Sequence, residues 1–212
     1  MEQIQNNRVI TDLYRENAQF PGIALDGSDV YLCWQRFVDR HDSLMASCRR
    51  GDEVVWEREI SDGGEVLHPV ILAHGGAIWY AWSEYARENW RILARCYRDG
   101  QWGEVLTVAS GEALFFPRLF TWQGKLHVIW TEQHKGSAAA VLCPLTEAGP
   151  GAAETVSVVG EAYRAGAAEG GDGNLYVAYD GFDGKQYKLF ARARTARDMI
   201  EYSEMSGLYK LY

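Results

Sequence analysis

Six residues that could bind a ligand lie at comparable places along the chain. They combine flat aromatic rings with acidic and basic groups, and they are Arg36, Phe37, Glu84, Tyr85, Glu132 and His134. Rings that stack on a ligand, together with charged groups that hydrogen-bond to it, are what binding of a sugar or a peptide requires. We therefore predict that these residues bind a glycan or a protein.

Catalysis by the same residues is a second hypothesis. A pair of carboxylates such as Glu84 and Glu132 could hydrolyse a glycosidic bond, but the separation that this needs is set in space and not in sequence. The sequence contains no serine nucleophile motif, no phosphate-binding loop and no dinucleotide fingerprint. We assign no catalytic residue, and the main hypothesis is a non-catalytic binding or scaffold module. A glycan-active enzyme is the alternative.

Cysteine and histidine do not predict a metal centre. There is no CxxC pair and no cluster with the spacing of zinc ligands, so we expect no metal and no cofactor. All four cysteines lie in apolar runs and are expected to be buried free thiols: Cys33, Cys48, Cys96 and Cys143. His127 shares a strand position with aromatic residues and is expected to belong to an aromatic layer.

The chain consists of four repeats. Trp34, Trp82 and Trp130 are 48 residues apart, and Tyr179 follows 49 residues later. Thirteen residues before each of them stand Pro21, Pro69, Pro117 and Gly166. A period of this length fixes the architecture before any local prediction is made.

Each repeat predicts one blade of a β-propeller. It contains four short runs that are rich in β-branched and aromatic residues and are separated by turn signals, which indicates antiparallel strands. We predict one all-β domain over residues 1–212, with four-stranded blades at about 21–64, 69–112, 117–161 and 166–207. The tryptophan column should pack between adjacent sheets. Polar loops at 35–42, 83–89, 131–136 and 180–186 should share one rim and carry the six candidate residues.

The ends of the chain leave the closure of the ring open. Residues 8–12 (RVITD) are similar to the outer strand of a blade that lacks its other strands. A single closed ring is the favoured arrangement. A ring made by two chains through their blade edges and a piece of a larger propeller are the alternatives, because bare sheet edges and blade faces are liabilities.

The repeats resemble those of sialidase-type propellers, which carry Asp-box (BNR) repeats, over residues 8–207. An Asp-box reads S-x-D-x-G-x-x-W, whereas the matching turns here read RRGDEVVW at 49–56 and RDGQW at 98–102, so the motif is degenerate. The resemblance implies six blades, a tyrosine nucleophile and a cluster of arginines on the first strands. YRAG at 163–166 resembles the segment that carries the first of those arginines, and Arg118 also lies on a first strand. We expect Arg118 and Arg164 to be solvated, or paired with acids, near the mouth of the channel.

Composition limits the partners. The 212 residues are 47% hydrophobic with a net charge of −8, which argues against nucleic acid as the main partner. No apolar run is long enough to span a membrane. The first residues lack the pattern of a signal peptide, so a cytoplasmic location is expected if the chain starts at its natural N-terminus.

Overall fold

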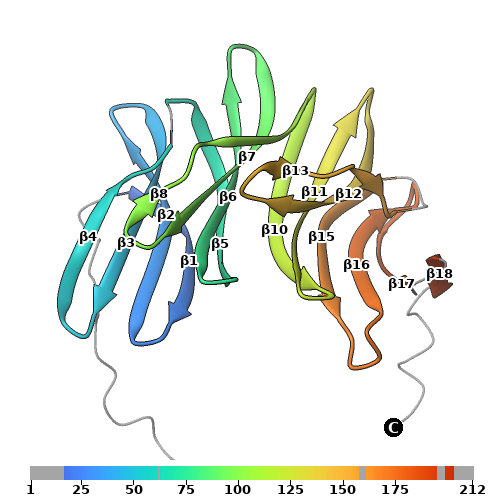
Figure 1. Ribbon diagram of the computed structural model, residues 1–212. Coiled ribbons are helices and arrows are strands. Elements are labelled where there is room, and N and C mark those ends of the chain that lie inside the picture. Colours follow the sequence, from blue (N-terminus) through green and yellow to red (C-terminus); the bar gives the residue numbers. More distant parts are fainter. Residues whose placement is uncertain (1–16, 62, 158–160, 195–198, 203–212) are drawn as a thin grey trace, which may run out of the picture.

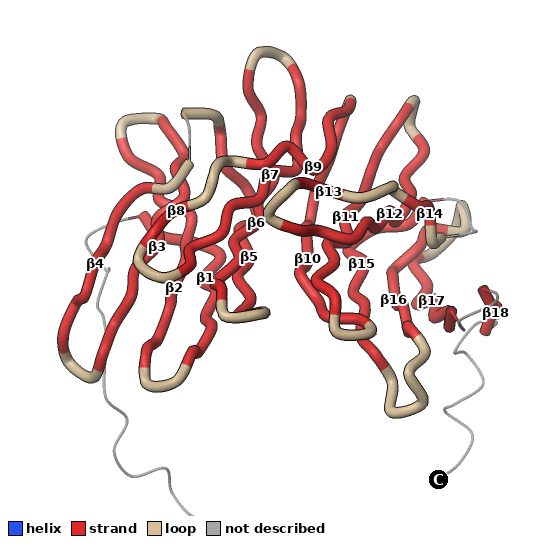
Figure 2. The backbone as a smooth tube through the Cα atoms, viewed as in Figure 1, coloured by secondary structure: helices blue, strands red, loops and turns tan. Residues whose placement is uncertain are grey.

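The computed structural model describes residues 17–61, 63–157, 161–194 and 199–202. These residues form strands and turns without any helix, and therefore no helix in them could cross a membrane (Figure 2). Four antiparallel sheets stand side by side in an arc, each with its strands in chain order (Figure 1). The predicted fold class, an all-β propeller with four blades in this chain, is confirmed.

The first two sheets cover the N-terminal half. The first contains β1 (Asn17–Asp26), β2 (Asp29–Val38), β3 (His41–Arg50) and β4 (Glu53–Glu59). The second contains β5 (Glu65–His74), β6 (Ala77–Ala86), β7 (Asn89–Arg98), β8 (Gln101–Trp102) and β9 (Leu106–Gly111).

The other two sheets follow the same plan. The third contains β10 (Ala113–Trp122), β11 (Lys125–His134), β12 (Ser137–Thr146), β13 (Gly149–Pro150) and β14 (Glu154–Thr155). The fourth contains β15 (Glu161–Glu169), β16 (Leu175–Phe182), β17 (Tyr187–Arg194) and β18 (Met199–Tyr202).

The fourth strand of the two middle blades is broken in two. β8 and β9 both pair with β7, and β13 and β14 both pair with β12. Each break contains a glycine whose amide donates to the preceding strand, from Gly103 to Cys96 O at 2.9 Å and from Gly151 to Pro144 O at 2.8 Å. A Cβ on Gly103 would lie 2.9 Å from the sulfur of Cys96, so the close approach requires glycine.

The first strands begin about four residues earlier than the proline column predicts. Each continues through the proline position with a β-bulge, as between Gln19 and Gly22 or between Leu67 and Val70. The first strands β1, β5, β10 and β15 contact one another in that order. No comparable packing joins the fourth sheet to the first within the described strands, so these residues alone do not form the predicted closed ring. The predicted orphan strand at 8–12 lies outside the described residues.

The tryptophan column packs between the sheets, as predicted. Trp82, Trp130 and Tyr179 are each at most 1% exposed. Trp82 packs with Leu44 of the first sheet, and Tyr179 packs with Ile129 of the third. A blade therefore buries its large rings against its neighbour and not within itself.

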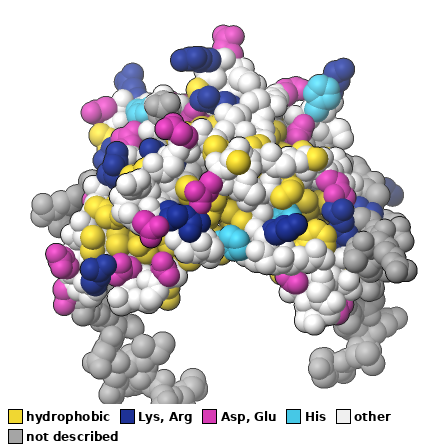
Figure 3. Space-filling model, in the orientation of Figure 1, with side chains coloured by type: hydrophobic (Ala, Val, Ile, Leu, Met, Phe, Trp, Pro, Cys, Tyr) yellow, Lys and Arg dark blue, Asp and Glu magenta, His cyan; other side chains and the backbone are white. Residues whose placement is uncertain are grey.

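The minor predictions about the core are also confirmed. All four cysteines are buried free thiols. His127 is buried and stacks on Phe120, with their ring centroids 5.3 Å apart, and its Nδ1 lies 3.0 Å from Lys125 O. On the face that Figure 3 shows, acidic and basic side chains are interspersed, so no patch of a single sign dominates it.

Truncating one ring of the tryptophan column should lower the stability of the folded protein. Trp82→Ala is expected to lower the free energy of unfolding by about 3–5 kcal/mol, because it opens a cavity between the first two sheets. Urea denaturation monitored by circular dichroism measures this. Tyr85→Ala is the matched control, because Tyr85 is 40% exposed, and it should cost less than about 1 kcal/mol. Equal losses in the two variants would contradict the packing role of the column.

Candidate functional site

The predicted rim loops are shorter than expected. The second and third strands run through them and are joined by two-residue turns with positive φ in the first three blades, at Asp39–Arg40, Arg87–Glu88 and Lys135–Gly136. Turns of this kind match the right-handed twist of the strands, so they replace a longer loop. The six candidate residues consequently lie on strand ends and not in loops.

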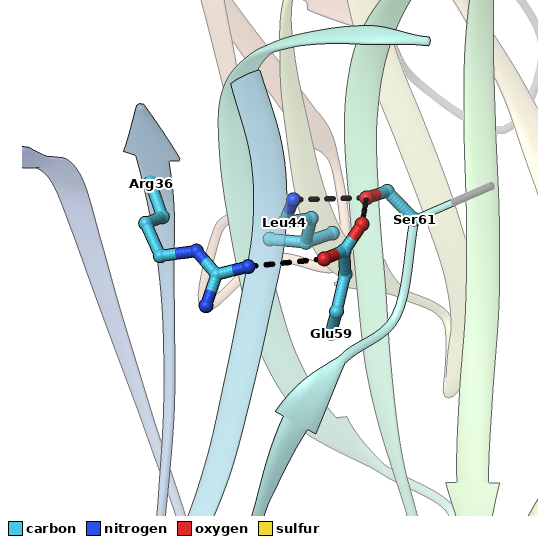
Figure 4. Close-up of polar contacts among 4 residues, drawn as sticks. All are labelled: Arg36, Leu44, Glu59 and Ser61. Carbon is cyan, nitrogen blue, oxygen red and sulfur yellow. Dashed lines mark hydrogen bonds and ion pairs between the residues drawn. The ribbon is translucent and has the colours of Figure 1, made fainter. Parts of the chain in front are cut away.

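Arg36, in the first blade, forms its contacts within its own sheet. Arg36 donates to Glu59 at 3.1 Å, and Ser61 donates to the same carboxylate at 3.3 Å (Figure 4). The hydroxyl of Ser61 also accepts the amide of Leu44 at 3.0 Å. Arg36 thus fastens the end of β4 to the hairpin. The neighbouring Phe37 is 40% exposed.

Glu84 is enclosed by protein. Its carboxylate is fully buried, forms an ion pair with Arg91 and accepts Trp82 Nε1 at 3.3 Å. A Cβ on Gly64 would overlap the Glu84 side chain, so a glycine is needed where the chain passes it. Glu84 therefore contacts structural partners, while the adjacent Tyr85 faces solvent.

The candidates of the third blade lie at the tip of the β11–β12 hairpin. Glu132 is half-buried, and the exposed His134 lies 3.1 Å from Glu112. Across the three hairpins, no hydrogen bond, ion pair or ring contact joins one of the six to another within the described residues. Their role in ligand binding stays a prediction.

A cavity of about 480 Å³ lies where the first strands of all four sheets meet. The side chains that distinguish it come from one repeat position, which holds Phe20, His68, Phe116 and Arg164. The ring centroids of Phe20 and His68 are 5.1 Å apart, and those of His68 and Phe116 are 4.2 Å apart. We call this space the axial cavity.

A strained backbone conformation orients these four side chains. Each has a φ between 46° and 54° and lies at the bulge of its strand. A non-glycine residue in this region costs on the order of 1–3 kcal/mol, and such strain gathers at functional sites. Bulges beside active sites re-aim a side chain, and here they direct one side chain from every blade to the axis.

Two arginines line the axial cavity, and no carboxylate does. Arg164 donates to both oxygens of Asp180, at 3.2 and 2.5 Å, which confirms that it is acid-paired. Arg118 is exposed and has no acidic partner within the described residues; its guanidinium lies 3.5 Å from Pro117 O. The lining of the cavity is thus cationic and aromatic.

His68 is neutral in this setting. Burial in the wall of the cavity, together with the charge of Arg118, lowers its pKa to about 4. Its Nδ1 is buried without a hydrogen-bond partner in the described residues. An uncharged ring between two phenylalanines therefore forms part of the wall.

The axial residues were not predicted from the strand pattern, although the sequence contains a signal for them. In the first three units they stand immediately before the proline column and read Phe-Pro, His-Pro and Phe-Pro, whereas Arg164 stands two residues before Gly166 and reaches the equivalent place through the bulge of β15. The prolines are constant while the preceding residue changes, and only the bulge reveals that these side chains converge. The residues that the structure describes contain no group of three metal-binding side chains.

No protein-family model and no curated protein matches the chain. Solved structures share its fold at low sequence identity. An endo-arabinase from Bacteroides thetaiotaomicron VPI-5482 has a TM-score of 0.57 and 12% identity, over 87% of this chain and 79% of that one. A mannose phosphorylase from Leishmania mexicana, in complex with phosphate, has a TM-score of 0.55 and 12% identity. The match covers 87% of this chain and 66% of that one. For a GH32 β-fructofuranosidase from Bombyx mori the values are 0.53 and 14%, over 90% of this chain and about half (51%) of that one.

These comparisons contradict the main functional hypothesis from the sequence. We expected a non-catalytic binding or scaffold module, whereas the structures that share the fold are glycan-active enzymes. The alternative, a glycan-active enzyme, is better supported. The resemblance to propellers of glycan-acting proteins holds at the level of the fold.

The shifted pKa of His68 predicts a pH dependence of stability. An unfolded histidine takes up a proton near pH 6.5, whereas folded His68 does so only near pH 4, so the unfolded state binds more protons between these values. Stability should therefore fall as the pH drops through this window. His68→Phe removes this contribution, and urea denaturation at several pH values should show a smaller loss for the variant. A difference between the two proteins that is independent of pH would contradict the assignment.

Proposed function

We propose that this protein is a glycan-active enzyme that binds a sugar in the axial cavity. The observation that carries the proposal is the convergence of one strained side chain per blade on a common cavity. The endo-arabinase, the phosphorylase and the fructofuranosidase that share the fold act as the supporting analogy.

The wall of the cavity suits the chemistry of a sugar. A pyranose or furanose presents C–H groups on one face and hydroxyl groups around its edge. The rings of Phe20 and Phe116 offer an apolar surface for the first, and neutral His68 and the guanidinium of Arg118 offer hydrogen bonds to the second.

Asp180 is our candidate for the reacting carboxyl group. It is paired with Arg164, which lines both the axial cavity and a second cavity of about 470 Å³, and Asp180 lines this second cavity with a side chain that is 21% exposed. Glu84 is fully enclosed, so of these two acids Asp180 is the one that a substrate can approach. Hydrolysis of a glycosidic bond uses two carboxyl groups, and phosphorolysis supplies a phosphate oxygen as the nucleophile.

The decisive experiment is a panel of glycosides. Arabinan, mannan, fructan, sialosides, uronides and other aryl glycosides are incubated with the purified protein, with and without inorganic phosphate, and released sugar or sugar phosphate is measured. At least one substrate should be turned over, and Asp180→Asn should lower kcat by about a hundredfold or more, the scale of a lost general acid or base. Asp26→Asn, at an exposed acid that ends β1, is the control and should leave kcat unchanged. Lack of turnover across the panel would refute the proposal.

A sialidase-like preference for acidic sugars is the finer form of this proposal. The resemblance implies arginines on first strands, and Arg118 and Arg164 both line the cavity. Arg118 has no acidic partner among the described residues, so it favours an anionic group on the substrate.

Replacing Arg118 tests this preference. Arg118→Gln should raise KM for a sialoside or uronide about tenfold while KM for a neutral glycoside changes little, because a charge-assisted hydrogen bond is lost only with the acidic sugar. Arg50→Gln is the matched control, since Arg50 is exposed, is paired with Asp29 where β3 ends and β2 begins, and does not line the axial cavity. An equal effect of Arg118→Gln on acidic and neutral substrates would contradict the finer proposal and leave the enzyme proposal intact.

A further inference from the structure

A row of aromatic rings leads from the axial cavity to the rim. Phe116 in the cavity wall is followed by Phe115, with ring centroids 6.2 Å apart. Phe115 on β10 meets Trp90 on β7 at 4.7 Å, and Trp90 meets Tyr85 on β6 at 5.2 Å. The row therefore climbs along the junction of the second and third sheets.

The rings of the row are only partly covered. Tyr85 is 40% exposed, and Trp90, Phe115 and Phe116 are intermediate, whereas the packing column at Trp82 is fully buried. Apolar rings that stay at the surface in a connected row are unusual for a structural core and typical of a binding surface. The row thus differs from the fully buried rings in its exposure, although Trp90 also packs against the core between the second and third sheets.

The Trp90–Phe115 contact between two sheets belongs to one blade junction, whereas the Tyr85–Trp90 pair within a sheet recurs in the fourth blade as Phe182–Tyr187. At the positions equivalent to Trp90 and Phe115, the junction of the first and second blades has Asp42 and Leu67. In repeat proteins the positions needed for packing stay alike, while those on a ligand-binding face diverge. The Trp90–Phe115 pair between the second and third sheets therefore makes this junction the candidate binding face.

Polar groups flank the row on the side of the third blade. Glu132 and His134 lie at the end of β11, next to the start of β10, and Nδ1 of His134 lies 3.1 Å from the carboxylate of Glu112. The β6–β7 and β11–β12 hairpins rise on the same edge of the arc (Figure 1). Three of the residues predicted from sequence, Tyr85, Glu132 and His134, thus belong to the two hairpins that border the row.

We propose that the aromatic row is a set of sugar subsites, and that the substrate is a linear glycan of several residues with one end in the axial cavity. Flat apolar rings with hydrogen-bonding groups beside them suit successive sugar units, which repeat one apolar face and one polar edge. This inference rests on the proposed function and extends it to the class of substrate. Tyr85, at the rim end, contacts only the units farthest from the cavity.

Affinity as a function of glycan length tests the row. Arabino-, manno- and fructo-oligosaccharides from disaccharide to hexasaccharide are titrated into the full chain by calorimetry. For the series that binds, affinity should rise with length. Tyr85→Ala should lower the affinity for the hexasaccharide about tenfold, which corresponds to about 1.4 kcal/mol, and leave the affinity for the disaccharide unchanged. Tyr85→Phe should keep the affinity, because it keeps the ring.

Tyr187→Ala is the matched control. Tyr187 is 64% exposed and occupies the repeat position of Trp90 in the fourth blade, away from the row. Three results would each contradict the subsite proposal. They are an affinity that is independent of glycan length, an equal weakening of short and long ligands by Tyr85→Ala, and the same loss of affinity with Tyr187→Ala. Turnover of short glycosides, without any effect of glycan length on affinity, would contradict the subsite proposal and leave the enzyme proposal intact. If binding depends on glycan length and is weakened by Tyr85→Ala, but no substrate of the panel is turned over, the subsite proposal is supported and the enzyme proposal is refuted.

Discussion

The structure depends on one constraint, which is that a four-stranded sheet of this composition cannot bury both faces by itself. The large rings are covered by the preceding sheet, as Trp82 is covered by the first blade and Tyr179 by the third. The two end sheets show what happens without a neighbour, since Ile23 and Leu25 in β1 and Leu189 in β17 are each more than half exposed in the described structure. Stacking also brings the first strands together, so the cavity at the axis is a consequence of the same packing.

Two kinds of charged group result from this arrangement. Between sheets, charges are enclosed and matched, as Glu84 is by Arg91, because an unpaired charge there would be costly. At the axis, the first strands surround an open cavity in which Arg118 is exposed, so it needs no acidic partner. The first kind stabilises the arc, and the second is available to a ligand.

Much of the fold could be predicted from the sequence, and less of the site. The tryptophan period determined the number of blades, and the strand runs determined their order. The two-residue turn at Asp39–Arg40 was missed because it lacks the usual glycine or asparagine, and the enclosure of Glu84 was missed because it depends on Gly64 and Arg91 from other strands. The axial side chains were missed because a one-residue bulge, invisible in a strand pattern, decides which way they face.

The axial column joins the fold to the proposed chemistry. Phe20, His68, Phe116 and Arg164 share a backbone conformation to within a few degrees of φ, yet they differ in polarity and charge. Packing alone would favour the same residue in each unit, as it does for the tryptophan column. A backbone strain that is kept in all four units, with a side chain that varies, is what is expected when the repeat supplies the geometry and each blade supplies a different contact to one bound molecule.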